Sequence, residues 1–214
     1  MQFEKEITRF APSPTGRIHL GHAFSALFSQ REAEKRNGKV LLRMENIDEA
    51  RCKAEYETYI KEDLNWLGFD WTGAVRRQSD HMEDYQIALQ KLKEIGVLYP
   101  CFCSRRDILK EVENSSGAPH DGIIGPDGPI YPGTCRSLTQ DLQDEGISSG
   151  KRYALRLDVR RAKDIVGNIS WFDADIGETP AKPEIFGDIV LARKDIMTSY
   201  HLSCTVDDNI QGIS

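Results

Sequence analysis

Long apolar runs are missing from this sequence, and so is the apolar N-terminal segment that directs secretion. No stretch is long enough to cross a bilayer, and the opening residues, MQFEKEITRF, carry charges where a secretion signal would be apolar. We therefore expect a cytoplasmic protein without a membrane partner. Internal repeats and coiled-coil heptads are absent as well, which excludes solenoid and fibrous folds.

The cysteines do not form the even set that is typical of a disulfide framework. The chain has five, and the cytoplasm would keep them reduced. Three of them, Cys101, Cys103 and Cys135, gather in one part of the sequence, separated by residues rich in Gly, Pro and Ser. Three thiolates and one further donor would complete the tetrahedral shell of a structural zinc ion. Three unrelated free cysteines are the alternative.

An excess of positive charge is also lacking. The net charge of −6 argues against an extensive non-specific nucleic-acid surface, because Lys and Arg make most phosphate contacts. A local contact stays open, since residues 151–163 hold six basic residues against one acidic residue, Asp158. A solvated strand face is the simpler explanation of this run. The 39% hydrophobic and 29% charged residues are those of an ordinary globular protein, long enough for one domain with an insertion.

Residues 8–22, TRFAPSPTGRIHLGH, combine a short apolar strand, a loop and the start of a helix. A helix start binds anions, because its first N–H groups lack intrahelical partners and carry the positive end of the dipole. His19 and His22 lie three apart, so both imidazoles can point at one phosphate. Gly21 between them would let a nucleotide approach the backbone closely. Two surface histidines on a capped helix are the alternative.

The next residues predict a βαβ unit with two parallel strands. The apolar spacing after His22 indicates a helix with Phe24 and Leu27 in the core, ended by Gly38, and residues 40–44 form an apolar strand. Ligands bind beyond the carboxyl ends of such strands. Glu45 follows the second strand directly and could receive an ammonium group there.

Two further interpretations depend on the charged residues near these ends. Glu45 could instead form an ordinary ion pair with Arg43 or Arg51. Residues 200–206 look like a strand of a pair, after which Asp207 and Asp208 either bind magnesium or cap a following helix.

Four motifs together resemble a known family. The run RFAPSPTGRIHLGH is similar to the opening of the catalytic domain in class I aminoacyl-tRNA synthetases of the glutamyl type. RMENIDEAR resembles that family's RIEDxDxxR, with Asn46 in place of an aspartate. DIVLARKDIMTSYHLSCTVDD resembles DIVLxRxDGxxxYQLAVVVDD, with Ile196 for glycine and His201 for glutamine. YPCFCSR and YPGTCR resemble the zinc-binding insertion of the glutamyl-queuosine tRNA(Asp) synthetases within this family.

The resemblance implies an α/β fold: a Rossmann-like, HIGH-type nucleotidyl-transferase catalytic domain with a small zinc-binding insertion. We expect the first half of the catalytic domain in residues 1–100, the insertion in 101–136, and a second part in 137–214. The family's domain continues to a KMSKS-type loop with a lysine that neutralises phosphate charge. We therefore expect this chain to be truncated before that loop and weak or inactive alone.

The resemblance also implies an activity, namely ATP-dependent activation of glutamate and its transfer to queuosine in the anticodon of tRNA(Asp). Its partners would be glutamate, ATP with Mg²⁺, and tRNA(Asp), and the chain would be a monomer with one structural Zn²⁺. The implied catalytic residues are His19 and His22. The other implied residues are Arg9, Ala11, Ser13, Glu45 and Tyr200 for glutamate, Pro12, Thr15, His19, Gly21 and His22 for ATP, and Cys101, Cys103, Tyr131 and Cys135 for zinc. His120 or water is the alternative fourth zinc ligand.

Three other functions remain open from the sequence. The chain could be a fragment of a discriminating glutamyl-tRNA synthetase. It could be a catalytically silent module that binds zinc, a nucleotide or RNA. It could also be a small-molecule nucleotidyltransferase with an HxGH motif, although Glu45 and the RFAPSPTG run would then have no explanation.

Overall fold

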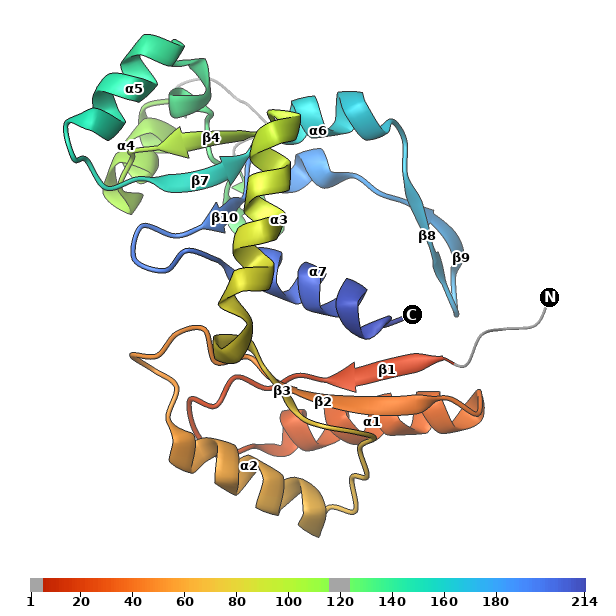
Figure 1. Ribbon diagram of the computed structural model, residues 1–214. Helices are drawn as coiled ribbons and strands as arrows, with labels where there is room; N and C mark the ends of the chain where they lie inside the picture. Colours follow the sequence, from red (N-terminus) through yellow and green to blue (C-terminus); the bar gives the residue numbers. More distant parts are fainter. Residues whose placement is uncertain (1–5, 116–123) are drawn as a thin grey trace. The chain divides into compact units, whose positions relative to one another are not determined.

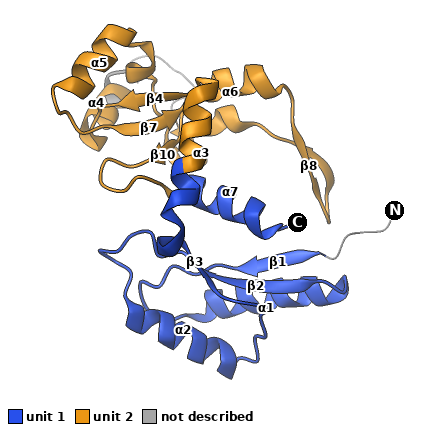
Figure 2. Cartoon of the chain, viewed as in Figure 1, with its two compact units in different colours: residues 1–86, 200–214 blue, residues 87–199 orange. Residues whose placement is uncertain are grey.

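The computed structural model describes residues 6–115 and 124–214. Their contacts form two compact units (Figure 1; Figure 2). Unit 1 comprises residues 1–86 and 200–214, and unit 2 comprises residues 87–199. Unit 1 therefore contains segments from both ends of the chain. Within the described ranges, no helix combines the length and the apolar character that crossing a membrane requires.

Unit 1 is built on a parallel three-stranded sheet in the order β1-β2-β3. Strand β1 (Ile7–Phe10) leads into helix α1 (Leu20–Lys35), and β2 (Lys39–Met44) pairs with β1 from Ile7 beside Lys39 to Phe10 beside Leu42. This is the predicted βαβ unit. The remaining elements are α2 (Ala54–Trp66), β3 (Arg76–Arg77), the 3-10 helix η1 (Gln78–His81), the start of α3 (Met82–Ile95) and α7 (Tyr200–Gln211).

The core of unit 1 corrects one prediction about α1. Phe24 is 70% exposed and Leu27 is 39% exposed, so neither is a core residue. The helix instead packs on β1 and β2 through small side chains, with Ala26 and Ala33 both buried. Small residues allow a close approach of the helix to the sheet. The aromatic side chains of the helix, Phe24 and Phe28, are exposed instead.

The end of α1 also differs from the prediction that Gly38 caps it. The helix ends at Lys35 with Arg36 as its C-cap, and Asn37, one residue before Gly38, takes the left-handed conformation with φ 52°. Gly38 is needed for a different reason. A Cβ atom there would lie 2.1 Å from the carbonyl oxygen of Glu6, so only glycine lets the chain pass that close to the residue that precedes β1.

Unit 2 contains an antiparallel sheet in the order β10-β7-β4 and two β-hairpins. The sheet strands are β4 (Leu98–Cys101), β7 (Ala154–Leu157) and β10 (Val190–Ala192). The hairpins are β5 (Ile124–Gly125) with β6 (Gly128–Pro129), and β8 (Ser170–Asp173) with β9 (Gly177–Pro180). The helices are α4 (Arg105–Ser115), η2 (Thr134–Ser137), α5 (Gln140–Ser148), α6 (Val159–Val166) and η3 (Pro183–Phe186).

The segment predicted as a strand over residues 200–206 is helical. Helix α7 buries Leu202, Ser203 and Asp207, whose spacing of one and four residues matches one helical face. Asp207 and Asp208 lie within this helix and do not cap a following one. Both carboxylates are paired with arginines of unit 1, as described below.

Part of the basic run at residues 151–163 works inside unit 2. The Arg156 guanidinium lies over the Tyr131 ring, 3.9 Å from its centroid, and donates a hydrogen bond to the carbonyl of Asp188. Arg152 donates to the carbonyl of Lys194. These contacts support the interpretation of the run as part of the fold more than as a free phosphate-binding surface.

Candidate functional site

The loop between β1 and α1 borders a cavity of about 340 Å³ in unit 1. Two backbone hydrogen bonds hold this loop, from Glu45 N to Pro12 O at 3.0 Å and from Lys53 N to Pro14 O at 3.1 Å. The loop is therefore fixed by the end of β2 and the start of α2. Six of the residues predicted to bind glutamate or ATP line the cavity, together with Phe10 and Ser25: Arg9, Ala11, Pro12, Ser13, Thr15 and His22.

The two histidines lie together at the start of α1. Their rings stack with centroids 3.9 Å apart. Nδ1 of His19 accepts a hydrogen bond from the backbone N–H of Gly21 at 3.1 Å, and Nδ1 of His22 accepts from the backbone N–H of His19 at 3.3 Å. When neutral, both rings must then carry their proton on Nε2. The pair thus offers two N–H donors beside each other.

The charge of this pair depends on its surroundings. Burial, together with the neighbouring His19, lowers the pKa of His22. Since His22 favours the neutral form at neutral pH, it acts as a hydrogen-bond donor to an anion more than as a full positive charge.

Gly21 shapes the pair. A Cβ atom at this position would lie 3.1 Å from Cε1 of His19 and 3.2 Å from its Nδ1. The missing side chain lets the His19 ring fold back over the first turn of α1 and cap it. This contact is a reason for glycine besides the expected approach of a nucleotide.

Glu45 is 7% exposed and pairs with Arg43, with Nη2 of Arg43 3.1 Å from Oε1. The ion pair that the sequence left open is thus formed with Arg43, whereas Arg51 pairs with Asp48. Burial raises the pKa of Glu45, and the positive charge of Arg43 only partly opposes this shift. The carboxylate lies at the carboxyl end of β2, beside the cavity-lining loop.

Arg9 and Arg43 converge on one carboxylate from α7. Arg9 donates through Nε and Nη2 to both oxygens of Asp208, at 2.8 and 3.0 Å, and Arg43 Nη1 donates to Oδ1 at 2.7 Å. Burial would raise the pKa of Asp208, but the hydrogen bonds of the two guanidinium groups outweigh it and lower the pKa. The Cys204 thiol lies 3.1 Å from Nη2 of Arg9 and 3.4 Å from Nη2 of Arg43.

Asp207 is fully buried and serves the core of unit 1. It accepts hydrogen bonds from Arg76 Nε at 2.7 Å, Gln78 Nε2 at 2.9 Å and the Tyr85 hydroxyl at 3.0 Å. These donors come from β3, η1 and α3, so one carboxylate joins three elements to α7. Its oxygens are occupied by donors of the protein, which removes the case for magnesium at this residue.

Tyr200 and Asn46 flank this network. Tyr200 begins α7 and is 57% exposed, and burial of its hydroxyl together with the nearby thiol of Cys204 raises its pKa. Asn46 is buried, and its Nδ2 donates to Glu57 at 3.0 Å. An aspartate at this position would face the Glu57 carboxylate as a like charge, which explains the amide here.

Sequence reasoning considered Arg43 only as a possible partner of Glu45 and missed its contact with Asp208. It missed Cys204 entirely, and it assigned Asp208 to a cap or a metal. Arg43 carried a usable signal, because it sits in the apolar strand VLLRM and a buried guanidinium must find carboxylates. Cys204 carried none, because its role depends on where α7 lies against β1 and β2.

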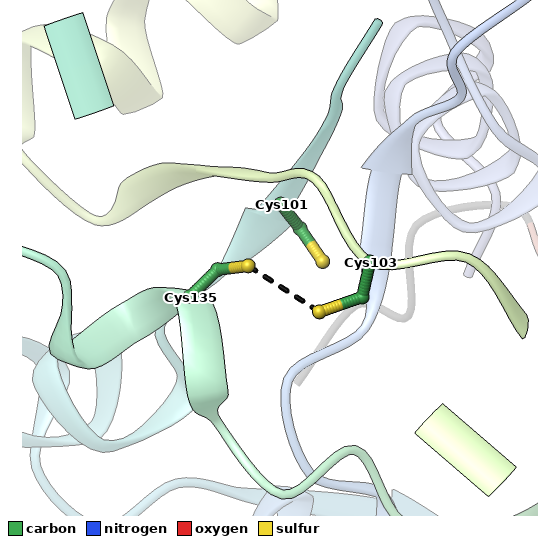
Figure 3. Close-up of side chains that lie close together, drawn as sticks. All are labelled: Cys101, Cys103 and Cys135. Carbon is green, nitrogen blue, oxygen red and sulfur yellow. Dashed lines mark hydrogen bonds between the residues drawn. The ribbon is translucent and has the colours of Figure 1, made fainter. Parts of the chain in front are cut away.

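The three clustered cysteines meet in unit 2 (Figure 3). Cys101 ends β4, Cys103 follows it by two residues, and Cys135 lies in η2. Their sulfur atoms point toward one another and lie within 4.8 Å, with Sγ of Cys103 3.4 Å from Sγ of Cys135. Four ligands at the zinc–sulfur bond length would hold sulfurs about 3.8 Å apart, so the cluster has the size for one ion.

The Tyr131 hydroxyl lies at the same centre. It is 3.6 Å from Sγ of Cys103 and accepts a hydrogen bond from the backbone N–H of Cys135 at 2.8 Å. Burial raises the pKa of Cys103 to about 12 and also raises that of Tyr131. Burial would raise the pKa of Cys135 too, but its hydrogen bonds with Tyr131, Phe102 and Cys103 together outweigh burial and lower it. The alternative ligand His120 lies outside the described residues.

Comparison with known proteins identifies the family. Residues 6–214 match the class I tRNA synthetases (E and Q), catalytic domain. The chain belongs to this family. Its Rossmann-like α/β fold is shared with the glutamate–tRNA synthetase of Elizabethkingia anophelis, at 25% identity and a TM-score of 0.76, over 99% of this chain and 43% of that one. The predicted fold class is thereby confirmed.

Curated members of the synthetase family resemble the chain along its length. The glutamyl-Q tRNA(Asp) synthetase of Rhodobacter capsulatus is 44% identical over 97% of this chain and 74% of its own. The enzyme of that name from Nitratidesulfovibrio vulgaris is 40% identical, covering 96% and 63%. The glutamate–tRNA ligase of Aquifex aeolicus is 38% identical, covering 97% and 41%. The chain thus spans between about two fifths and three quarters of these relatives.

Proposed function

We propose that the chain belongs to an enzyme that activates glutamate with ATP and transfers it to queuosine in the anticodon of tRNA(Asp). The main support for glutamate is the pair of opposite charges at the cavity, Arg9 on its lining and Glu45 beside it. A guanidinium suits a carboxylate of glutamate, and a carboxylate suits its ammonium group. Tyr200, at the start of α7, would complete this set.

The ATP side of the proposal rests on the start of α1. The two Nε2–H donors of His19 and His22, together with the helix dipole, favour a phosphate group there. In the reaction, a carboxylate oxygen of glutamate attacks the α-phosphate, a new P–O bond forms, and pyrophosphate leaves. Charge on the phosphate oxygens grows on the way, and preorganised donors stabilise it. Pro12, Thr15 and Gly21 shape the path of the nucleotide, which would bring Mg²⁺ with it.

We further propose one structural zinc ion, held by Cys101, Cys103, Cys135 and Tyr131. Three sulfurs with a phenolic oxygen make a closed shell, which leaves no position for a substrate. The ion would join the end of β4 to η2 and so define the insertion. Cys52 and Cys204 belong to unit 1 and take no part.

Queuosine in tRNA(Asp), as opposed to the glutamate acceptor of a glutamate–tRNA ligase, is supported by the relatives named glutamyl-Q tRNA(Asp) synthetase. The second candidate is a fragment of a glutamate–tRNA ligase, favoured by the 38% identical relative of that name. We propose a monomer that acts in the cytoplasm in either case.

Glutamate-dependent exchange of pyrophosphate into ATP, without tRNA and with glutamine as a control, tests the activation step. Exchange with glutamate alone, at whatever rate this chain supports, would favour the proposal, and Glu45→Ala should abolish it while remaining folded. Exchange that appears only after tRNA is added would favour the ligase, whereas none under either condition would identify the chain as a binding module. Normal glutamate affinity in Glu45→Ala would contradict the assignment of Glu45.

A further inference from the structure

One carboxylate on α7 contacts the two arginines next to the cavity. Oδ1 of Asp208 accepts from Arg9 Nε at 2.8 Å and from Arg43 Nη1 at 2.7 Å, and Oδ2 accepts from Arg9 Nη2 at 3.0 Å. Three charge-assisted hydrogen bonds thus end on a single side chain. The Asp208 side chain is 29% exposed, unlike its buried neighbour Asp207.

The contact with Arg9 is bidentate, so it fixes the orientation of the guanidinium group as well as its distance from Asp208. Two parallel N–H···O bonds hold the guanidinium in the plane of the carboxylate. Both bonds use one edge of the group, formed by Nε and Nη2. The remaining nitrogen, Nη1, lies on the other edge, where the donors for a bound ligand would be.

The contact with Arg43 carries the influence of Asp208 to Glu45. Arg43 uses Nη1 for Asp208 and Nη2 for Glu45, at 2.7 and 3.1 Å. Arg43 is fully buried, so its guanidinium cannot turn to water when one partner is lost. The side chain that binds Asp208 is therefore also the one that orients Glu45.

We propose that Asp208 is a positioning residue for amino-acid binding, which fixes Arg9 directly and Glu45 through Arg43 so that one ligand can meet both charges. The inference rests on the proposed function, since Arg9 and Glu45 are its glutamate-binding groups. A rigid pair of opposite charges at a set separation selects a ligand with a carboxylate and an ammonium group at a matching separation.

A purely structural role for Asp208, as a tie between α7 and the sheet, makes a different prediction. Loss of a tie would loosen unit 1 and weaken every ligand together. Loss of a positioning residue would weaken the amino acid and spare ATP, because the proposed phosphate donors at the start of α1 have no hydrogen bond to Asp208 in the described part of the chain.

The experiment measures the Kd of glutamate and the Kd of ATP separately by calorimetry on this chain and three variants. Asp208→Asn removes the charge at nearly unchanged size, and Asp208→Glu keeps the charge but moves it. Asp63→Asn is the matched control, because Asp63 receives two bonds from Arg17 on the surface of the same unit.

For Asp208→Asn we expect glutamate affinity at least tenfold weaker and ATP affinity within twofold of the wild type. Asp208→Glu should recover part of the lost glutamate affinity. Asp63→Asn should bind both ligands as the wild type does. Unchanged glutamate affinity in both Asp208 variants, or equal losses for the two ligands, would overturn the inference. A wild-type chain that binds ATP but no glutamate would refute the proposed function itself. If Asp208→Asn does not fold, the glutamate-to-ATP comparison in Asp208→Glu decides the question.

Discussion

Each unit joins distant parts of the chain, but the two units use different chemistry, ion pairs in one and clustered thiols in the other. In unit 1, carboxylates on α7 receive hydrogen bonds from arginines on β1, β2 and β3. In unit 2, sulfurs from β4 and η2 converge on one another, with a tyrosine hydroxyl among them. The first junction is complete in the protein alone, because each charge faces its opposite. The second gathers similar groups that gain little from one another until a cation joins them.

This difference implies different failure modes. Breaking one ion pair of unit 1 leaves a buried charge without compensation, but the other pairs persist. Removing the proposed zinc ion from unit 2 would affect all its ligands together, since each would contribute through the same ion. Four measurements would sharpen or break this comparison.

Cysteine replacement in unit 2 should have the largest effect. Cys135→Ser should abolish stoichiometric zinc, which we expect at about one ion per chain, and cost several kcal/mol, since structural zinc contributes roughly 10 kcal/mol or more in small domains. Metal analysis and thermal unfolding would measure both. Cys52→Ser, which lies outside the cluster, is the control. Full zinc content in Cys135→Ser would contradict the site.

The buried carboxylate of unit 1 should come second. Asp207→Asn removes a fully buried counter-charge shared by Arg76 and Arg43, and the loss of one partner from a buried pair costs about 3–5 kcal/mol. Urea unfolding of the variant would give this value. A loss below about 1 kcal/mol would mean that the amide replaces the carboxylate adequately for Gln78 and Tyr85.

Acid should separate the two junctions. Protons compete with zinc for thiolates, so we expect the proposed zinc ion to leave as the pH becomes acidic. Asp208 has a lowered pKa in the folded chain, so its stabilisation is complete above its ordinary value of 3.8 and is lost as the pH falls through the lower folded value. A pH titration that follows zinc release and helix content together should therefore show two steps. One shared step would break the comparison.

The smallest effect is expected at an exposed ion pair that has the same bidentate chemistry. Arg17 donates two bonds to Asp63, but its side chain is 60% exposed. Asp63→Asn should leave the free energy of unfolding almost unchanged, because solvent and salt screen the pair. A loss as large as that of Asp207→Asn would show that burial is not what separates them.

The fold class was predicted from the resemblance to the synthetase family, the βαβ unit from local periodicity, and the meeting of the three cysteines from their spacing. Sequence reasoning misplaced Phe24 and Leu27, since a helical stripe shows which residues share a face but not which face packs. Residues 200–206 were predicted as a strand because they alternate, and Leu202, Cys204 and Val206 fit that period. The helix is favoured by contacts that no local pattern contains, above all those from Arg76, Gln78 and Tyr85 to Asp207.

The two adjacent aspartates of α7 are identical in the sequence but lie in different environments in the structure. Asp207 and Asp208 are the same residue in consecutive positions, yet one is fully enclosed and the other is 29% exposed. In a library of all single substitutions, selection for folding should retain only aspartate at position 207 but several residues at position 208. Selection for activity should retain only aspartate at both positions. The difference between the two selections would distinguish positions that are constrained by stability from positions that are constrained by recognition.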